Sequence, residues 1–319
     1  MGRRTFQDLT VIDFHSHFRL RQDGSMTRTE PVYEPGTPAH DAAQHRKTQV
    51  AKYAEQWRYA WDFPTPETDD RPWQEEADLW VEELEKYGVD RIGFVTGGGN
   101  DRLFEVVRRH PDDIIGFAHH EPFGEDAAAE LERSVTQLGL KGYKLIAPTL
   151  SKPINDRSAY PTWEVAAKHG IPVLIHFGML GGPGGIAFND KINPALLEPV
   201  ARDFPTVNFV VPHFGIQFVK ELLFLCWACP NVHVDTSGSN QWVRWMPYQL
   251  TLDDLFRKFL ETIGPERIIF GTDSSWFPRG FAIRYLQDQI RICRFMGLKH
   301  DDLQLIFGGN AARLLRVEL

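Results

Sequence analysis

Short runs of apolar, often β-branched residues alternate with amphipathic stretches along the whole chain. Eight such runs can be followed, at residues 10–15, 91–97, 114–120, 140–146, 172–178, 208–215, 231–237 and 267–273. The last six stay apolar over several consecutive positions, as is typical of parallel strands that are covered on both faces. The pattern therefore predicts eight parallel strands.

The segments between these runs have the spacing of helices. Residues 74–88 carry apolar and aromatic side chains at helical intervals and end at Gly88, a typical helix stop. The same plan recurs at residues 101–111, 125–139, 194–205 and 252–264. Each predicted strand but the first is thus close to a helix.

Eight strands that alternate with helices predict an α/β fold, a (β/α)₈ TIM barrel in one domain over residues 1–319. A doubly wound open sheet is the alternative fold. Its dinucleotide-binding form is disfavoured, because no G-x-G-x-x-G follows the first strand.

Residues 19–73 depart from this alternation. They separate the first strand from the first clear helix, are rich in proline, and include an aromatic, helical-looking stretch at residues 50–63. Long connections in compact domains are usually functional or disordered, and the aromatic content argues against disorder. We expect an insertion that covers the C-terminal mouth of the barrel as a lid or contacts another subunit.

Chemically capable side chains gather at the C-terminal ends of the predicted strands, where barrel active sites lie. Because residues i and i+2 of a strand point to the same side, His15 and His17 should both face the barrel axis. With His176 and Asp273 they offer three imidazoles and one carboxylate to a divalent ion, a set that suits Zn²⁺ and also accepts Mn²⁺ or Fe²⁺. The other strand-end residues are His119, His120, Lys144 and His213.

Two of these positions leave alternatives open. Adjacent strand residues face opposite ways, so at most one of His119 and His120 faces the pocket, and we assign His120 to substrate binding. Lys144 could be carboxylated and bridge two metal ions, but no second set of metal ligands is evident in the sequence. We therefore expect an ammonium group that pairs with a carboxylate or binds an anionic substrate.

Aromatic and basic residues are further candidates for the substrate pocket. Arg244 and Arg279 could hold a carboxylate, so the expected substrate is a small cyclic or aromatic acid. The rings could equally serve packing alone. The aromatic candidates are Trp57, Trp61 and Trp276, with Trp242, Trp245 and Phe277 nearby.

Composition and charge restrict the partners. The chain has 35 basic and 43 acidic residues and a net charge of −8, which disfavours binding to nucleic acid or to an anionic membrane. No apolar run is long enough for a transmembrane helix. Three cysteines, and an N-terminus without an apolar signal region, fit a cytoplasmic protein. Cys226 and Cys229 form a Cys-x-x-Cys at a predicted helix C-terminus, so we interpret them as buried apolar residues and not as a redox pair.

Several motifs occur in a recognisable order. They are DFHSHF, GLKGYKLI, IPVLIHFG, NFVVPHFG, NVHVDTSG and RIIFGTDSSWFPRG. The set resembles the amidohydrolase superfamily, and within it the amidohydrolase-related family that includes aminocarboxymuconate-semialdehyde decarboxylase. The resemblance runs from the first strand to the C-terminal GGNAARLL.

The resemblance implies roles for individual residues. His15, His17 and His176 would be metal ligands. Asp273 would bind or face the metal ion and handle protons, and His213 would assist catalysis beside it. The resemblance also implies a homodimer or larger assembly, which acts on a small molecule.

The family contains hydrolases of cyclic esters and amides as well as non-oxidative decarboxylases. Its decarboxylases usually continue the strand-eight aspartate with Tyr-Pro, whereas here Ser274 and Ser275 follow Asp273. This departure favours a hydrolase of a cyclic ester or amide, with a decarboxylase of an aromatic or muconate-type acid as the alternative. A non-catalytic metal-binding barrel ranks lowest, because Asp273 and His213 are both present.

Overall fold

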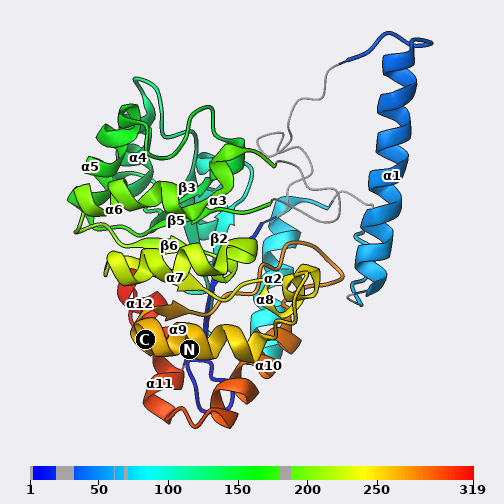
Figure 1. Ribbon diagram of the computed structural model, residues 1–319. Coiled ribbons are helices and arrows are strands. Elements are labelled where there is room, and N and C mark those ends of the chain that lie inside the picture. Colours follow the sequence, from blue (N-terminus) through cyan, green and yellow to red (C-terminus); the bar gives the residue numbers. More distant parts are fainter. Residues whose placement is uncertain (1–2, 19–31, 61, 68–70, 180–187) are drawn as a thin grey trace.

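A computed structural model describes residues 3–18, 32–60, 62–67, 71–179 and 188–319. Eight parallel strands follow one another around a barrel in chain order, and helices surround them (Figure 1). The strands are β1 (Ile12–His17), β2 (Arg91–Thr96), β3 (Ile114–His119), β4 (Gly142–Ile146), β5 (Val173–His176), β6 (Phe209–Val211), β7 (Val232–Asp235) and β8 (Ile268–Ile269). Each lies within one of the predicted apolar runs or overlaps it.

The barrel closes between β1 and the residues that follow β8. Here the Phe14 N–H donates to the Phe270 carbonyl at 3.1 Å, and the His17 N–H donates to the Ser274 carbonyl at 2.8 Å. The open-sheet alternative leaves these edges unpaired. The predicted (β/α)₈ barrel is therefore confirmed.

Helices lie between the strands as predicted. Gly88 ends α2 in the left-handed conformation, with φ 68°, which glycine adopts without a steric penalty. Besides α1, described below, the longer helices are α2 (Trp73–Tyr87), α3 (Asn100–Arg109), α4 (Ala127–Thr136), α5 (Tyr160–His169), α7 (Val219–Ala228), α9 (Leu252–Ile263) and α10 (Ile283–Phe295). Helix α6 (Glu198–Asp203) has six residues. Other short helices are α8 (Ser239–Trp242), α11 (His300–Gln304) and α12 (Asn310–Leu315).

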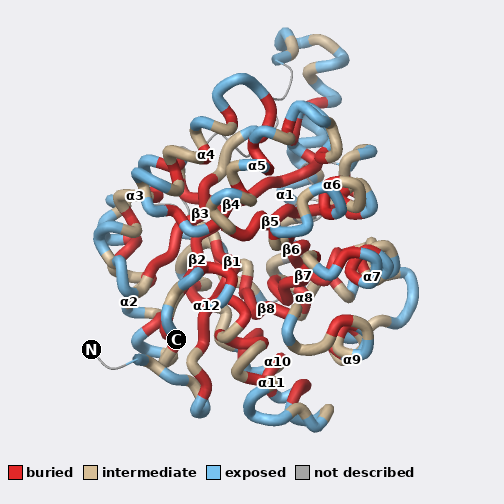
Figure 2. The backbone as a smooth tube through the Cα atoms, turned by 90° about the vertical axis from the view of Figure 1, so that its left-hand side faces the viewer, coloured by how far each residue is buried: buried red, intermediate tan, exposed pale blue. Residues whose placement is uncertain are grey.

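Two apolar cores fill the molecule, and buried residues follow the strands (Figure 2). The larger core lies between the strands and the helices. The smaller one fills the barrel itself with Ile12, Phe14, Val95, Ile115, Phe117, Leu174, Val210 and Ile269, and residues of α12 belong to it. Most of these side chains come from the early or middle part of their strands. Apolar packing therefore fills the N-terminal half of the barrel, and polar chemistry is left to the opposite end.

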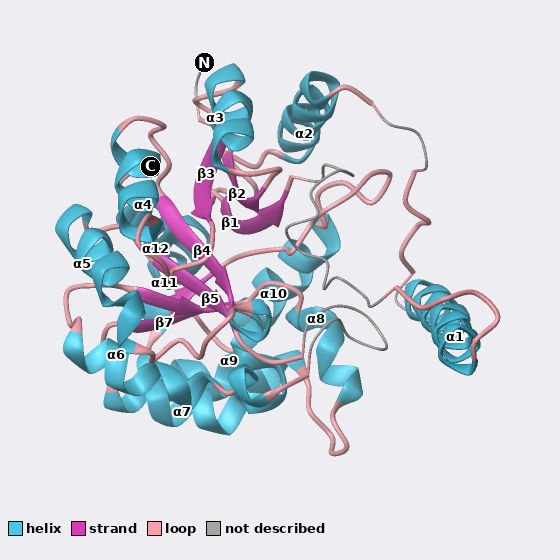
Figure 3. Cartoon of the chain, turned by 90° about the horizontal axis from the view of Figure 1, so that it is seen from above, coloured by secondary structure: helices cyan, strands magenta, loops and turns pink. Residues whose placement is uncertain are grey.

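Helix α1 (Pro38–Ala60) stands apart from the barrel (Figures 1 and 3). Most of its described side chains are exposed, and Ala43 is buried. The chain returns to the body beyond it, where Arg244 donates to the Ala60 carbonyl at 2.5 Å and the Glu67 N–H donates to the Phe277 carbonyl at 3.0 Å. Both partners follow strand ends, so the return lies on the C-terminal side of the barrel.

Two other sequence features can be placed. Cys226 and Cys229 are free and buried at the C-terminal end of α7, where burial raises the pKa of the Cys226 thiol to about 12. Such thiols are poor nucleophiles, in keeping with the packing interpretation. Within the described ranges, no helix has the length and apolar character to cross a membrane.

Candidate metal centre

The histidines of β1 meet the carboxylate that follows β8. His17 Nε2 lies 3.1 Å from Asp273 Oδ1, and His15 Nε2 lies 4.0 Å from the same oxygen. One ligand atom of each of the three residues lies within 4.8 Å of the others. Two imidazole nitrogens and a carboxylate oxygen at this spacing can share one divalent ion.

Two further histidines continue the cluster. His213 Nε2 lies 3.2 Å from His176 Nδ1, and the His213 ring centroid is 5.1 Å from that of His15. The other ring nitrogen of His176, Nε2, is buried and has no hydrogen-bond partner among the described residues. Such a nitrogen is costly to bury unless it binds something. His15, His17 and Asp273 fit a divalent metal ion, and the free nitrogen makes His176 a candidate for a further ligand.

Hydrogen bonds to the Nδ1 atoms of His15 and His17 orient the two rings. His15 Nδ1 lies 2.8 Å from Asp235 Oδ2 and 3.0 Å from Ser237 Oγ, while His17 Nδ1 lies 2.7 Å from Thr96 Oγ1. Metal-binding histidines commonly use the second nitrogen in this way, which fixes the tautomer and the ring orientation. Both Nε2 atoms are thereby left to face Asp273.

Asp235 and its neighbour Ser237 were missed by the sequence analysis. Asp235 is the last residue of β7, so the search of strand ends that yielded His15 and Asp273 also covers it. The sequence signal that could have found it is its position at a strand end, two residues after His233. Its second oxygen accepts hydrogen bonds from the backbone N–H groups of His213, at 3.2 Å, and of Ser237, at 2.9 Å. One buried carboxylate thus orients residues from three strands.

A second buried carboxylate joins β1 to the segment after β8. Asp13 accepts hydrogen bonds from the Thr272 N–H at 3.0 Å and from the Ser16 hydroxyl at 2.8 Å. Burial raises the pKa of Asp13 to about 7, against the lowering effect of these hydrogen bonds. The contact brings the strand of His15 and His17 next to the residue that precedes Asp273.

Asp273 and His213 lie beyond their strands, in left-handed backbone. Their φ angles are both 59°, whereas β8 ends at Ile269 and β6 at Val211. Non-glycine residues rarely adopt this conformation, and it is concentrated at functional sites. The backbone turns at these residues, and not strand alternation, determine where the two side chains point.

The local charges favour metal binding. Burial, and next the charge of Lys144, lower the pKa of His15 to about 3, and burial with the charge of His213 lowers that of His176 well below its usual range. Burial alone would raise the pKa of Asp273, but the hydrogen bond from His17 and the charges of the histidines lower it. Neutral imidazoles and an ionised carboxylate are the forms that coordinate a metal ion.

Lys144 reaches the same cluster from β4. Its Nζ lies 3.2 Å from His15 Nε2, and burial lowers its pKa to about 8. His119 is its register partner on β3, and His119 Nδ1 lies 2.9 Å from the Lys144 carbonyl oxygen. Register partners on parallel strands face the same side. His119 therefore accompanies Lys144 on the barrel side of the sheet.

A family model described as amidohydrolase matches residues 12–317. The chain belongs to the amidohydrolase family. It is accordingly a metal-dependent enzyme, and the predicted resemblance is confirmed.

Two curated relatives match parts of this amidohydrolase. Protein fluG of Emericella nidulans is 30% identical over 146 residues, which are 44% of this chain and only 16% of fluG. The 2-keto-4-carboxy-3-hexenedioate hydratase of a Sphingobium species is 24% identical over 252 residues, 67% of this chain and 69% of the hydratase. The chain thus spans a small part of the first relative and about two thirds of the second.

Solved structures share the fold along nearly the full length. An uncharacterised TIM-barrel protein of Bordetella bronchiseptica has a TM-score of 0.65 and 21% identity, covering 97% of this chain and 99% of that one. The 5-carboxyvanillate decarboxylase of Sphingomonas paucimobilis has a TM-score of 0.62 and 17% identity, and the match covers 98% of this chain and 100% of the decarboxylase. A protein of Acinetobacter baumannii described as a probable 2-pyrone-4,6-dicarboxylic acid hydrolase has a TM-score of 0.60 and 15% identity. The match covers 97% of this chain and 100% of that protein. At these identities the likeness concerns the fold alone.

His120 does not join the cluster of this amidohydrolase, contrary to expectation. Its Nε2 lies 3.0 Å from the Ala127 carbonyl oxygen, and its ring packs against Tyr143 with centroids 4.9 Å apart. Phe117 of the same strand belongs to the core inside the barrel. Strand alternation then directs His119 inward and His120 outward, where its ring packs against Tyr143.

The two arginines also differ from expectation. Arg244 is exposed and donates to the end of α1, at Ala60. Arg279 donates to the Asp273 carbonyl at 2.9 Å, with its guanidinium 4.3 Å from the Phe63 ring centroid and 4.9 Å from that of Trp276. Trp276 is thus engaged in the same stack. Both arginines contact protein groups near the segment that returns from α1, and their assignment to a substrate carboxylate stays a prediction.

The remaining aromatic candidates cannot be placed. Trp61 and the side chain of Trp57 lie outside the described residues. Their assignment to the substrate pocket stays a prediction.

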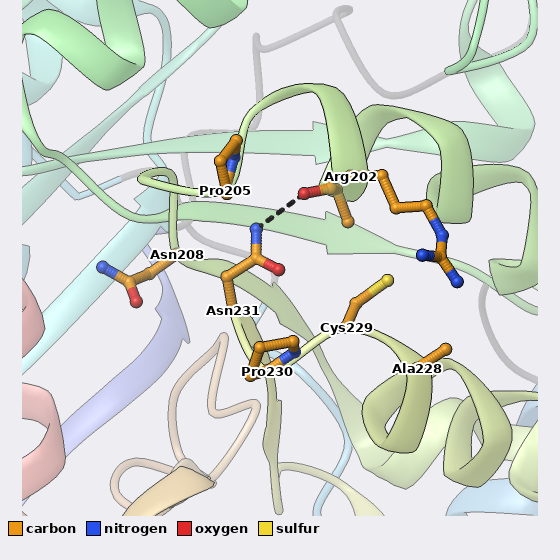
Figure 4. Close-up of a pocket in the computed structure, with 8 residues that line it drawn as sticks. Arg202, Pro205, Asn208, Ala228, Cys229, Pro230 and Asn231 are labelled. Carbon is orange, nitrogen blue, oxygen red and sulfur yellow. Dashed lines mark hydrogen bonds between the residues drawn. The ribbon is translucent and has the colours of Figure 1, made fainter.

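A cavity of about 490 Å³ lies at the other end of the barrel (Figure 4). Asn208 and Asn231, which precede β6 and β7, line it together with residues of α6 and α7. Asn231 donates to the Ala201 carbonyl at 3.0 Å, and Asn208 Oδ1 lies 3.0 Å from His233 Nε2. These polar groups are already used within the fold, so the cavity adds no chemistry to the metal centre.

Proposed function

We propose that this amidohydrolase hydrolyses a cyclic ester or amide of a small cyclic or aromatic acid, with one divalent ion held by His15, His17, His176 and Asp273. The observation that carries the proposal is the carboxylate of Asp273, whose Oδ1 lies 3.1 Å from His17 Nε2 and 4.0 Å from His15 Nε2. Zn²⁺ is the first choice for such a set of nitrogens and one oxygen, and Mn²⁺ or Fe²⁺ are the alternatives.

The bound ion would supply Lewis acidity and lower the pKa of a water molecule. The side chains would do the rest. Asp273 accepts a proton from the attacking water and returns it to the leaving group. His213 donates from Nδ1 to the Ser237 carbonyl, so its Nε2, on the side of His176, would accept a hydrogen bond from the attacking water.

Lys144 would bind the acid group of the substrate. In the protein its Nζ contacts His15 Nε2 at 3.2 Å, the same nitrogen that a metal ion would use. An ammonium that loses this acceptor needs another, and a substrate carboxylate is the strongest one available. We place His119 beside it, in place of His120.

Decarboxylation of an aromatic or muconate-type acid is the second candidate. The carboxyvanillate decarboxylase with the same fold supports it, as the pyrone dicarboxylate hydrolase supports the first. In this reaction Asp273 would protonate the carbon that loses CO₂. Both reactions use the same residues, so the assay must separate their products.

A substrate panel separates the candidates. Metal-loaded protein is incubated with dihydrocoumarin, the cyclic ester of an aromatic acid, with cyclic amides, and with 2,6-dihydroxybenzoate, while acid release and CO₂ are read separately. Acid from the lactone or an amide, without CO₂, is the expected result. CO₂ from the benzoate would instead establish the second candidate, and loss of a conjugated double bond from an unsaturated acid would indicate hydration, as named for the Sphingobium relative. Metal binding with no reaction in any arm would favour the non-catalytic barrel.

The assembly and setting are also proposals. We propose a homodimer or larger assembly in which residues 19–73 form a lid or a subunit contact, supported by the exposure of α1 on the C-terminal side of the barrel. A cytoplasmic location is supported by the three free, buried cysteines. Light scattering of the whole chain, compared with a variant that lacks residues 38–60, tests the first point. An unchanged mass would remove α1 from any subunit contact.

A further inference from the structure

We propose that Arg279 is a positioning residue that holds Asp273 in its left-handed conformation, and that Phe63, at the end of the inserted segment, keeps Arg279 in place. The proposal rests on the role of Asp273 given above and goes beyond it. Under this proposal, the inserted segment helps to orient the carboxylate of Asp273.

Asp273 needs support from its surroundings. Its φ of 59° is unfavourable for a residue with a β-carbon, so the conformation persists only where neighbours fix it. Two backbone hydrogen bonds do so. The Asp273 N–H donates to the His15 carbonyl at 2.8 Å, and the Asp273 carbonyl accepts from Arg279 Nη1 at 2.9 Å. The first bond belongs to barrel closure, whereas the second depends on a single side chain.

Arg279 is itself held by rings and not by a carboxylate. Its guanidinium carbon lies 4.3 Å from the Phe63 centroid and 4.9 Å from the Trp276 centroid, with Tyr285 at 5.6 Å. The ion pairs between described residues do not include Arg279, and its Nε is buried without a hydrogen-bond partner among those residues. A planar cation between aromatic faces is the arrangement that arginine favours and lysine reproduces poorly.

Phe63 is fixed by the return of the chain from α1. Its N–H donates to the Arg58 carbonyl in the last turn of α1 at 2.9 Å, and its ring meets Trp276 at 5.6 Å, nearly edge to face. On either side, Asp62 pairs with Arg284 at 3.0 Å and the Glu67 N–H donates to the Phe277 carbonyl at 3.0 Å. Contacts therefore run without a gap from the end of α1 through Phe63 and Arg279 to Asp273.

The loop that follows Asp273 meets the inserted segment at Phe63. Trp276 and Arg279 both lie in the sequence TDSSWFPRG that follows Asp273. Each makes its contacts with Phe63, a residue of the insertion. The loop and the inserted segment are thus joined through Phe63.

The test uses four variants of the full chain, Arg279→Lys, Arg279→Met, Phe63→Leu and the matched control Arg284→Met. Arg284 fixes the same segment through Asp62 but has no contact with Asp273 in the described part of the chain, and both partners of its ion pair are exposed. Two readouts are taken, the dissociation constant of Mn²⁺ by electron paramagnetic resonance and the kcat and KM for dihydrocoumarin. Melting temperatures verify that each variant is folded.

We expect Arg279→Met to lower kcat by roughly 10²-fold, the scale of an active-site displacement near 1 Å, with KM nearly unchanged. Arg279→Lys and Phe63→Leu should lower kcat by a smaller factor. Weaker Mn²⁺ binding in these variants would also support the proposal. The double variant Phe63→Leu/Arg279→Met should be no worse than Arg279→Met alone, because both act through one contact.

Three results would overturn the proposal. The first is that both readouts stay unchanged in folded Arg279 variants. The second is a rise in KM alone, which would make Arg279 a substrate contact. The third is an equal loss in Arg284→Met. Asp273→Asn serves as the reference. If it also leaves Mn²⁺ affinity and turnover unchanged, the proposed role of Asp273 fails; if it alone changes them, only the role of Arg279 fails.

Discussion

The two ends of the barrel use buried histidines in different ways. His15 lies at the C-terminal end and His233 on β7 toward the N-terminal end, and burial lowers the pKa of each to about 3. His15 is surrounded by Asp235, Lys144 and Ser237 from other strands. His233 has one side-chain partner in the described structure, Asn208 at 3.0 Å, and its Nδ1 has none.

The difference shows what makes a site out of buried polar groups. His233 and Asp235 stand two residues apart on one strand, so both point to the same side. Around His233 the barrel is filled by apolar residues such as Val210, its register partner. Around Asp235 the polar atoms of several strands face one another. A histidine with a low pKa thus indicates burial, and only convergence of ligand atoms indicates chemistry.

The largest expected effect is loss of the metal ion. His15→Ala and His17→Ala should each lose metal and turnover together, because each removes a proposed ligand. His233→Gln should keep about one divalent ion per chain, since His233 lies at the other end of the barrel. Elemental analysis of the three purified proteins checks this. A stoichiometry near two in the native protein, with extra mass on Lys144, would contradict the single-ion centre and favour a carbamate bridge.

A loss of turnover without a loss of metal is the next effect. Asp273→Asn keeps the size of the side chain and one oxygen that can coordinate, but it removes the base. Turnover should fall by about 10²-fold or more while most metal stays bound. Metal content and kcat are measured on the same preparation. Full metal with near-normal turnover would move the role of proton carrier to His213.

The fold could be predicted from the sequence because strands and helices have different periods. The apolar runs located all eight strands, and Gly88 ended its helix as predicted. His15 and His17 both reach Asp273, as strand alternation predicts, although the pairing of β1 with β2 shifts register on either side of Ser16. Alternation alone could not decide between His119 and His120, since either parity was open until the core inside the barrel was known.

The remainder of the site depends on backbone geometry that has no sequence period. Asp273 and His213 lie beyond β8 and β6, in left-handed turns, so no strand pattern could aim their side chains. The sequence could not show that Arg279 contacts Phe63, because the two residues are more than 200 positions apart in the chain. Contacts of this kind between an insertion and a distant loop appear only in the folded chain.

A smaller effect should come from the groups that orient the ligands. Asp235→Asn keeps the shape behind His15 but removes the charge that lies 2.8 Å from its Nδ1. Metal affinity should fall by roughly 10- to 100-fold, as is usual when such a partner is lost. Competition with a chelator measures the affinity. The control is Asn208→Asp next to His233, which should leave it unchanged, and an equal loss in both variants would indicate a general effect on the barrel.

The smallest expected effect is a pH dependence of stability that comes from His233, at the N-terminal end of the barrel. Burial, and next the charges of Arg313 and Arg267, lower the pKa of His233 to about 3 from its ordinary value of 6.5. Below pH 6.5 the unfolded chain therefore binds a proton that the folded chain does not. The free energy of unfolding should fall as the pH decreases, by at most about 1.4 kcal/mol per pH unit from this residue, until the pH approaches the pKa of His233 in the folded protein.

Urea unfolding of metal-free protein at pH 6.5 and 5.5 measures this dependence of the free energy of unfolding on pH. His233→Gln should reduce it by about 1 kcal/mol, whereas replacement of the exposed His300 by Gln controls for the substitution itself. An unchanged slope in His233→Gln would mean that His233 takes up its proton in the folded barrel, and that the two ends are more alike than their contacts indicate.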